Sequence, residues 1–177
     1  EHSHTEGLYA VIGQFLFVIR TVKAQVCTVQ HAPDEPLRAV RRRFVADGDQ
    51  IGLSVFFGYE SCYQGTEFLI YGVDEEWLLT HPEIKDATIT EQLQLVREQG
   101  GLVMHAHPFR EEAYIPRVRL FPELVDGVEG INATHSSHLS TSHNDPRFDE
   151  RAIAYAREHD LPMSAGSDVH STLMLGG

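Results

Sequence analysis

The sequence predicts an α/β fold in which strands and helices alternate to build a parallel sheet or barrel. From residue 51 onward, short apolar runs typical of buried strands alternate with segments whose apolar residues recur at helical spacing. Such alternation favours a parallel α/β architecture over a sandwich of two antiparallel sheets. The length of 177 residues suits one domain, so we expect a single domain over residues 1–177.

The first part of the chain is the least informative. Leu8–Arg20 is strongly apolar, too short for a membrane span and interrupted by Gly13, so a buried helix or strand is the better interpretation. The basic cluster of Arg38 and residues 41–43 is typical of a solvated helix face. We assign no further structure to residues 8–46.

The rest of the chain gives clearer signals. A capping box of Thr88 and Glu91 opens a helix, and Asp145 followed by Pro146 opens another. Acidic residues in the first turn indicate a short helix from Asp74. Helices are therefore predicted over 74–79, 89–99 and from 145 to about 159. Strands are predicted over Ile51–Tyr59, Glu67–Val73, Leu102–His105, Gly127–Asn132 and Leu161–Ala165.

The net charge and the cysteine content indicate which binding partners and which cellular compartment to expect. A net charge of −12 argues against nucleic-acid binding driven by bulk electrostatics, although bound metals could reverse the local potential. Two cysteines form no disulfide framework, so we expect a reducing cytoplasm. No membrane segment is visible, and the expected partner is a small molecule.

Polar residues gather where the predicted strands end. His105 and His107 come at the end of an apolar strand, and would share one face if extension continues. Imidazole and carboxylate ligands together suit Zn, Mn or Fe. A carboxylate that bridges two such ions, with histidines around it, would suggest a hydrolytic centre that clamps phosphate. The candidate ligands are Glu60, Glu67, His105, His107, Asp168 and His170.

Each of these residues also has a plain structural interpretation. A single histidine is more often a surface or core residue than a ligand, and we interpret His31, His81 and His159 in this way. Glu60 alone could be an acid at a helix N-terminus. The two motifs at His105–Pro108 and Gly166–His170, each after its own apolar strand, together favour a metal site.

Five motifs resemble the PHP (polymerase and histidinol phosphatase) domain family. They cover residues 48–177 and the first few positions, and read Glu1-His2, Phe57-Gly58-Tyr59-Glu60, Ala106-His107-Pro108, Glu129-Gly130-Ile131-Asn132 and Gly166-Ser167-Asp168-Val169-His170. The resemblance implies a distorted (β/α)7 TIM-like barrel, here without its first strand, that holds two or three ions of Mn, Zn or Fe and hydrolyses phosphoesters.

The resemblance also implies roles for individual residues. Glu60 would bridge two metals, and Asp168 or a metal-bound hydroxide would handle the proton of the nucleophile, so Glu60 and Asp168 are the predicted catalytic residues. His105 would pack beneath the site or support a ligand. The full set of implied metal ligands is Glu1, His2, Glu60, Glu67, His107, His135, Asp168 and His170.

These expectations lead to a metal-dependent phosphoesterase acting on a small phosphorylated metabolite or nucleotide. Arg110 and Asn132 are the predicted substrate contacts, because guanidinium matches phosphate oxygens, although Arg110 could equally be an ordinary loop arginine. The alternative is a PHP-like domain that binds metal without turnover. An amide hydrolase with a carbamylated lysine is disfavoured, because the only lysines, Lys23 and Lys85, stand at no strand end.

Overall fold

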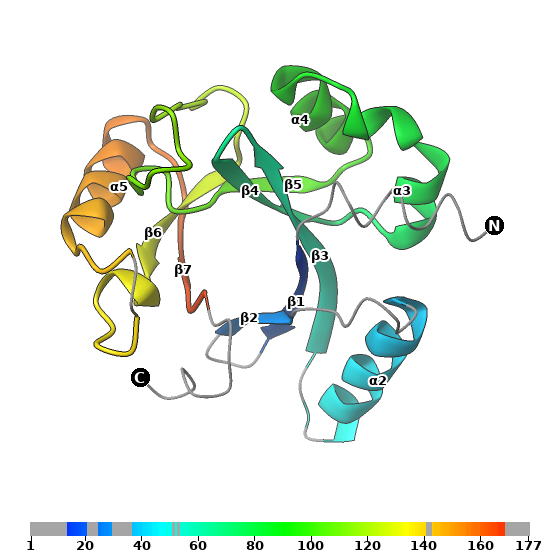
Figure 1. Cartoon of the computed structure of the whole chain (residues 1–177). Coiled ribbons are helices and arrows are strands. Elements are labelled where there is room, and N and C mark those ends of the chain that lie inside the picture. The colour runs from blue at the N-terminus through cyan, green and yellow to red at the C-terminus, as the bar shows by residue number, and fades with distance from the viewer. Residues whose placement is uncertain are drawn as a thin grey trace.

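The computed structural model describes residues 14–20, 25–29, 37–50, 52, 54–140 and 143–168 (Figure 1). Seven strands and several helices lie in these ranges. The strands are β1 (Gln14–Arg20), β2 (Gln25–Val29), β3 (Ser54–Tyr63), β4 (Thr66–Tyr71), β5 (Leu102–His105), β6 (Gly127–Asn132) and β7 (Met163–Gly166). The α-helices are α2 (Leu37–Gln50), α3 (Glu75–Thr80), α4 (Ile89–Glu98) and α5 (Arg147–Glu158), and short 3₁₀ turns cover Pro82–Lys85 (η1) and Ala133–His135 (η2).

The seven strands form one mixed sheet in the order β2-β1-β3-β4-β5-β6-β7. Pairing is antiparallel from β2 through β5, and only β5–β6 and β6–β7 are parallel. The sheet curls so that β2 and β7 approach each other, but no backbone pairing joins these edges within the described residues. The predicted (β/α)7 barrel is therefore wrong, because hairpins replace strand–helix–strand units in the first half of the chain.

A tight hairpin connects β3 to β4. Tyr63 pairs with Thr66, and the two residues between them, Gln64 and Gly65, have φ angles of 51° and 80°. Two consecutive positive φ angles define a turn whose twist matches that of the flanking strands. The turn therefore joins β3 and β4 directly, and β3 extends to Tyr63, beyond the predicted end at Tyr59.

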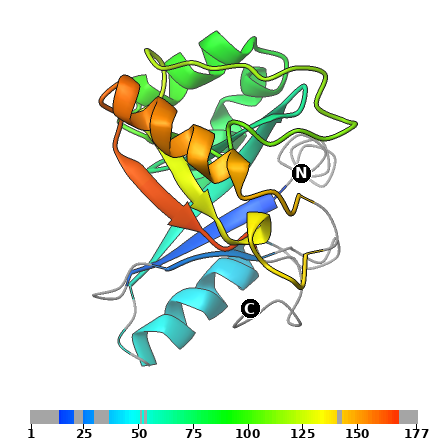
Figure 2. The ribbon, with the colours of Figure 1, turned by 90° about the vertical axis from the view of Figure 1, so that its left-hand side faces the viewer.

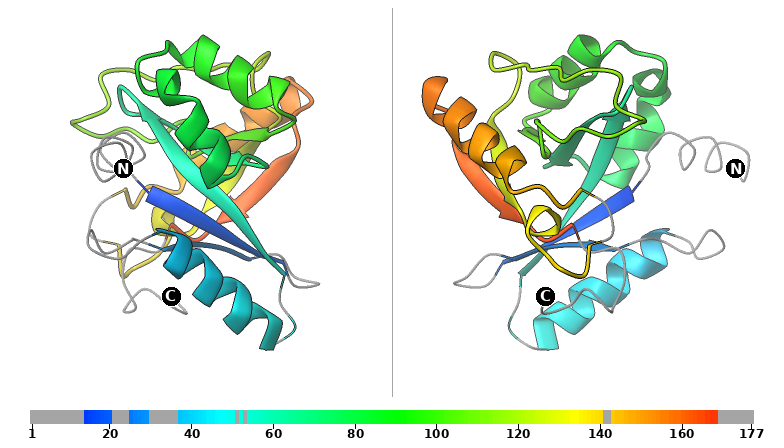
Figure 3. Two further views of the ribbon diagram at one scale, coloured as in Figure 1. Left: turned by 90° about the vertical axis from the view of Figure 1, so that its right-hand side faces the viewer. Right: turned by 60° about the vertical axis from the view of Figure 1, so that its left-hand side comes forward.

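The helices lie on the outer side of the curled sheet (Figures 1 and 3). The main core forms where alternate residues of β3, β4 and β5 meet α3 and α4, and it includes Phe68, Ile70, Val103, Leu78 and Leu93. Because strand side chains alternate, the residues between these core positions point to the concave side of the sheet. This alternation decides which side chains can form a site there.

The start of α4 follows its sequence signal, whereas α5 begins at Arg147, two residues after the predicted start at Asp145. The predicted capping box opens α4: Glu91 N–H donates to Thr88 Oγ1 at 3.4 Å, and the Thr88 N–H donates to the Glu91 carboxylate at 2.8 Å. Asp145 Oδ1 accepts from the N–H of Arg147 at 3.0 Å, where α5 begins. α5 then packs on β6 through Ala152 and Ala156 (Figure 2).

The first part of the chain holds two strands and a helix. β1 covers the second half of the apolar Leu8–Arg20 segment, and α2 carries the basic cluster, with Arg42 exposed and α2 packed against β3 (Figure 3). No helix in the described part of the chain has both the length and the apolar character that crossing a membrane requires.

Candidate metal centre

Two carboxylates reach the concave side of the sheet from the β3–β4 hairpin. Cys62 stands directly opposite Glu67 in the antiparallel pair, and Glu60 precedes Cys62 by two residues, so all three share one face. Glu60 lies inside β3, which corrects the prediction that it follows the strand. Glu67 is the second residue of β4, close to its predicted place at the strand start.

The histidines of the His105–Pro108 motif point to opposite sides of the sheet. His105 ends β5 as predicted and is fully buried on the outer side, where its ring stacks on Phe68 at 4.9 Å and lies 6.3 Å from the Phe121 ring. His107 has a positive φ of 25°, which breaks the strand alternation. Its imidazole reaches the concave side, so the expectation of a shared face is wrong.

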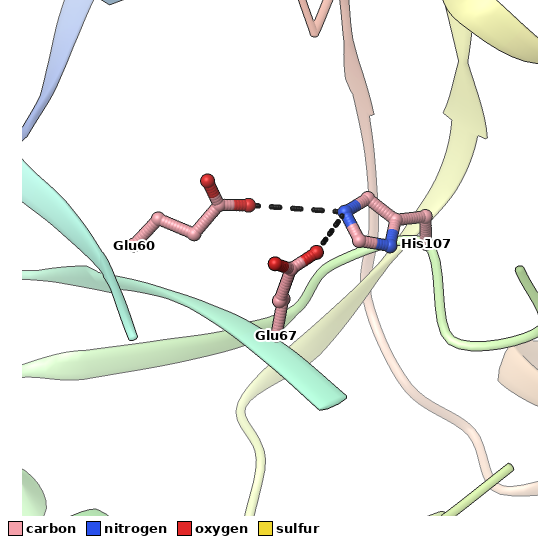
Figure 4. A group of neighbouring side chains, drawn as sticks. All are labelled: Glu60, Glu67 and His107. Carbon is pink, nitrogen blue, oxygen red and sulfur yellow. Dashed lines mark ion pairs between the residues drawn. The ribbon is translucent and has the colours of Figure 1, made fainter. Parts of the chain in front are cut away.

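His107 meets both carboxylates through one ring nitrogen (Figure 4). Its Nε2 lies 3.1 Å from Glu67 Oε2 and 3.7 Å from Glu60 Oε1, and neither approach has the geometry of a hydrogen bond. The three ligand atoms lie within 4.8 Å of one another. The His107 side chain is buried, while the Glu60 and Glu67 side chains are partly accessible to solvent.

The charges of this group act strongly on one another. Burial lowers the pKa of the His107 imidazole, but the carboxylates of Glu60 and Glu67 outweigh burial and raise it to about 10. Burial likewise raises the pKa of Glu67, yet the nearby His107 lowers it overall. The two carboxylates therefore favour a positive charge at the point where they converge.

The geometry and the donor set suit a divalent metal ion. Two carboxylate oxygens and one imidazole nitrogen form a ligand set used for Zn, Mn and Fe, with further positions left for water or substrate. The buried Nε2 of His107 lacks a hydrogen-bond partner within the described residues, although buried polar atoms normally have one. A cation between Glu60, Glu67 and His107 would satisfy this nitrogen.

Glu129 accepts a hydrogen bond from the backbone of His107, one member of this group. It lies in β6, is 4% exposed, and its Oε2 accepts from the His107 backbone N–H and from Asn132 Nδ2, each at 3.0 Å. A methyl group added at Gly166 of β7 would collide with Glu129 Oε1. The neighbouring parallel strand thus needs glycine at this point to make room for the carboxylate.

Arg110, which is buried, forms an ion pair with the partly buried Asp168 next to Glu129. Arg110 Nη2 donates to Asp168 Oδ2 at 2.5 Å, and the Arg110 side chain is only 4% exposed. Asn132 Nδ2 also donates to Asp168 Oδ2, at 3.2 Å. Burial lowers the pKa of Arg110, but Asp168 more than compensates and raises it. Arg110 is engaged inside the protein, and Asn132 bridges Glu129 and Asp168.

His135 has partners on both sides of its ring. Its Nδ1 lies 2.5 Å from Asp149 Oδ1, and its Nε2 accepts from Arg110 Nε at 3.4 Å. Both nitrogens are therefore used, with the Nδ1 proton directed at Asp149. His135 lies in η2, directly after β6, and is 1% exposed.

The structure unites part of the predicted ligand set. Glu60, Glu67 and His107 form one group, while Asp168 and His135 lie in the adjoining hydrogen-bond network; Glu1, His2 and His170 lie outside the described residues. Two supporting carboxylates had no predicted role: Glu129, which stands in one of the five motifs, and Asp149. A signal for Glu129 existed, because an acid inside an apolar strand is rarely buried without partners.

Comparison with known proteins gives one match. A family model described as PHP-associated matches residues 146–177, from α5 to the end of the chain, and this match supports a relationship to the PHP family. No curated protein and no solved structure matches the chain.

Proposed function

We propose that this protein is a metal-dependent hydrolase of phosphoesters, whose ion is held by Glu60, Glu67 and His107. The observation that carries the proposal is the convergence of two carboxylates on a buried imidazole nitrogen that has no hydrogen-bond partner in the part of the chain that the structure describes. The PHP-associated match supports the reaction class, because members of that family are often hydrolases.

Some residues of the site would bind the metal ion, and others would position these ligands. A divalent ion bound here would supply Lewis acidity and activate a water molecule at neutral pH. Glu60 and Glu67 contribute negative charge from the hairpin, and His107 contributes its Nε2 lone pair. The hydrogen bond from the His107 backbone N–H to Glu129 holds the backbone from which the imidazole extends toward the carboxylates.

A narrow cleft borders Glu67 and His107 of this group. Arg110 is engaged with Asp168, whereas Arg117 is exposed and lines the same cleft as Glu67 and His107. Guanidinium groups match phosphate oxygens bidentately, so we propose Arg117 as the contact for the substrate phosphate. The arginines that line this cleft are Arg110, Arg117 and Arg119.

The test is phosphate release from a model aryl phosphate by the purified chain. We expect activity with added Mn or Zn, loss of activity on chelation, and at least a tenfold loss in the Glu67→Gln variant, because a ligand charge is removed. Glu98→Gln is the matched control, since Glu98 is exposed on α4. Hydrolysis that is indifferent to chelator would contradict the proposal. Metal binding without hydrolysis would instead favour a non-catalytic metal-binding domain.

A further inference from the structure

We propose that the Arg110 guanidinium is a built-in cation that takes the place of a second metal ion, so that the centre holds one exchangeable ion. The inference rests on the proposed metal site at Glu60, Glu67 and His107. It concerns the neighbouring network around Asp168, where the sequence predicted further ligands.

The guanidinium engages one carboxylate oxygen of Asp168 and the Nε2 atom of His135, two atoms through which a second ion could be bound. Arg110 Nη2 donates to Asp168 Oδ2 at 2.5 Å, and Arg110 Nε donates to His135 Nε2 at 3.4 Å. An N–H directed at an imidazole nitrogen occupies the lone pair through which that nitrogen would bind a metal. Asp168 and His135 are thus both turned toward the same fixed positive charge.

Surrounding contacts hold the guanidinium in this position. Arg110 Nη2 lies 3.3 Å from Thr134 Oγ1, and Asn132 Nδ2 donates to the same Asp168 oxygen at 3.2 Å. On the far side of the His135 ring, Nδ1 lies 2.5 Å from Asp149 Oδ1. With Arg110 only 5% exposed, neither the arginine nor its partners can turn away without leaving buried polar groups unpaired.

Electrostatic repulsion also disfavours a second metal ion beside Asp168. A second divalent ion beside Asp168 would lie next to a buried guanidinium, and like charges repel strongly where water is excluded. Arginine cannot relieve this repulsion by losing a proton. The carboxylates Glu60 and Glu67 lack such a fixed arginine contact among the described interactions, so they remain the place where an exchangeable ion binds.

The first test is the metal content of the full chain, measured by native mass spectrometry and elemental analysis after loading with excess Mn and removal of free metal. We expect one ion per chain. Two or three ions would overturn the inference and leave the proposed site intact. No bound ion would overturn the proposed site together with the inference, so the two failures are distinguishable.

The metal content of Arg110 variants then tests whether the guanidinium excludes a second ion. Arg110→Gln removes the fixed charge, and we expect its count to rise to two, whereas an unchanged count of one would overturn the role of Arg110. Arg110→Lys keeps a cation and should still bind one ion; two ions in this variant would also contradict the inference, even if Arg110→Gln fails to fold.

Two further variants complete the experiment. Arg119→Gln is the matched control, because Arg119 contacts the Gln64 backbone and side chain instead of Asp168, and one ion is expected. His107→Phe should reduce the count from one to zero. An ion retained by His107→Phe but lost when Asp168→Asn is added would lie with Asp168 despite Arg110, and this result would overturn the inference.

Discussion

The backbone N–H of His107 donates to Glu129 Oε2 at 3.0 Å, and both residues are buried. This hydrogen bond holds the segment in which His107 leaves the strand geometry with a φ of 25°. The turn aims the imidazole at Glu60 and Glu67. Glu129 therefore acts on the candidate centre through the backbone of a ligand, without touching the ion position itself.

Gly166→Ala tests this support. The added methyl group would displace the Glu129 carboxylate, and we expect metal affinity to fall about 10–100-fold, the usual effect of losing a partner of a ligand. Overpacking should also lower the free energy of unfolding by about 1–3 kcal/mol. Both are measurable, by metal titration and by urea denaturation in chelator.

Gly130→Ala is the matched control for this substitution. A methyl group there would meet flexible side-chain atoms of Met163 at 3.3 Å, away from Glu129 Oε1. If both alanine variants bound metal as tightly as the wild type, Glu129 would have no role in placing His107.

The two histidines of β5 and its exit should respond differently to substitution. His105→Phe should keep metal affinity, because His105 packs between Phe68 and Phe121 on the outer side of the sheet. Its stability should stay equal or rise by about 1 kcal/mol, since the Nδ1 of His105 is buried without a partner within the described residues. His107→Phe should abolish metal binding. Calorimetric metal titration decides, and equal losses in both variants would contradict the assignment.

The capping box of α4 is a local source of stability. Thr88→Ala should lower the free energy of unfolding by about 1 kcal/mol, because the Glu91 backbone N–H loses its acceptor. Thr90→Ala, on the exposed side of the same first turn, is the control and should change stability by less than half as much. Denaturant unfolding of both variants measures the difference.

Asp145 should titrate well below an ordinary aspartate. Hydrogen bonds from the Arg147 side chain and backbone lower the pKa of Asp145 to about 2. A lowered folded-state pKa means that the stabilisation is present above the unfolded value near 3.8 and is lost as pH falls toward 2. In Arg147→Met, NMR titration should give a higher pKa for Asp145. Arg151→Met, whose arginine pairs with Glu111, should leave it unchanged.

Local signals predicted local structure well. The strands Leu102–His105 and Gly127–Asn132 match β5 and β6 residue for residue, and the Thr88–Glu91 box marks the start of α4. In these segments the periodicity, caps and glycines all act within a few residues. The pairing of strands depends on residues that are farther apart in the sequence, and the predicted pairing in a barrel was wrong.

The barrel prediction failed at the β3–β4 connection. Gln64-Gly65 between two apolar runs is compatible with a two-residue hairpin turn, which makes the strands antiparallel. The prediction of a parallel sheet from these two runs is therefore wrong, because the turn pairs them as antiparallel strands. The positions of Glu60 and Glu67 could be expected near the site, but their shared hairpin could not follow from a barrel.

The sequence pattern also could not predict that His105 and His107 point to opposite sides of the sheet. Alternation predicts a common face only while the chain stays extended, but β5 ends at His105 and His107 has a positive φ. The acceptor that stabilises the turned backbone, Glu129, lies 22 residues later in β6. A contact at that separation is decided by tertiary packing.

The hairpin between β3 and β4 makes the candidate centre sensitive to strand register. Glu60 and Glu67 face the same side only because exactly two residues separate Tyr63 from Thr66. If β4 slipped by one residue against β3, Glu67 would turn toward the core and Phe68 toward the concave side. Insertions or deletions of one residue at Gln64-Gly65 would therefore dismantle the ligand set without altering any ligand.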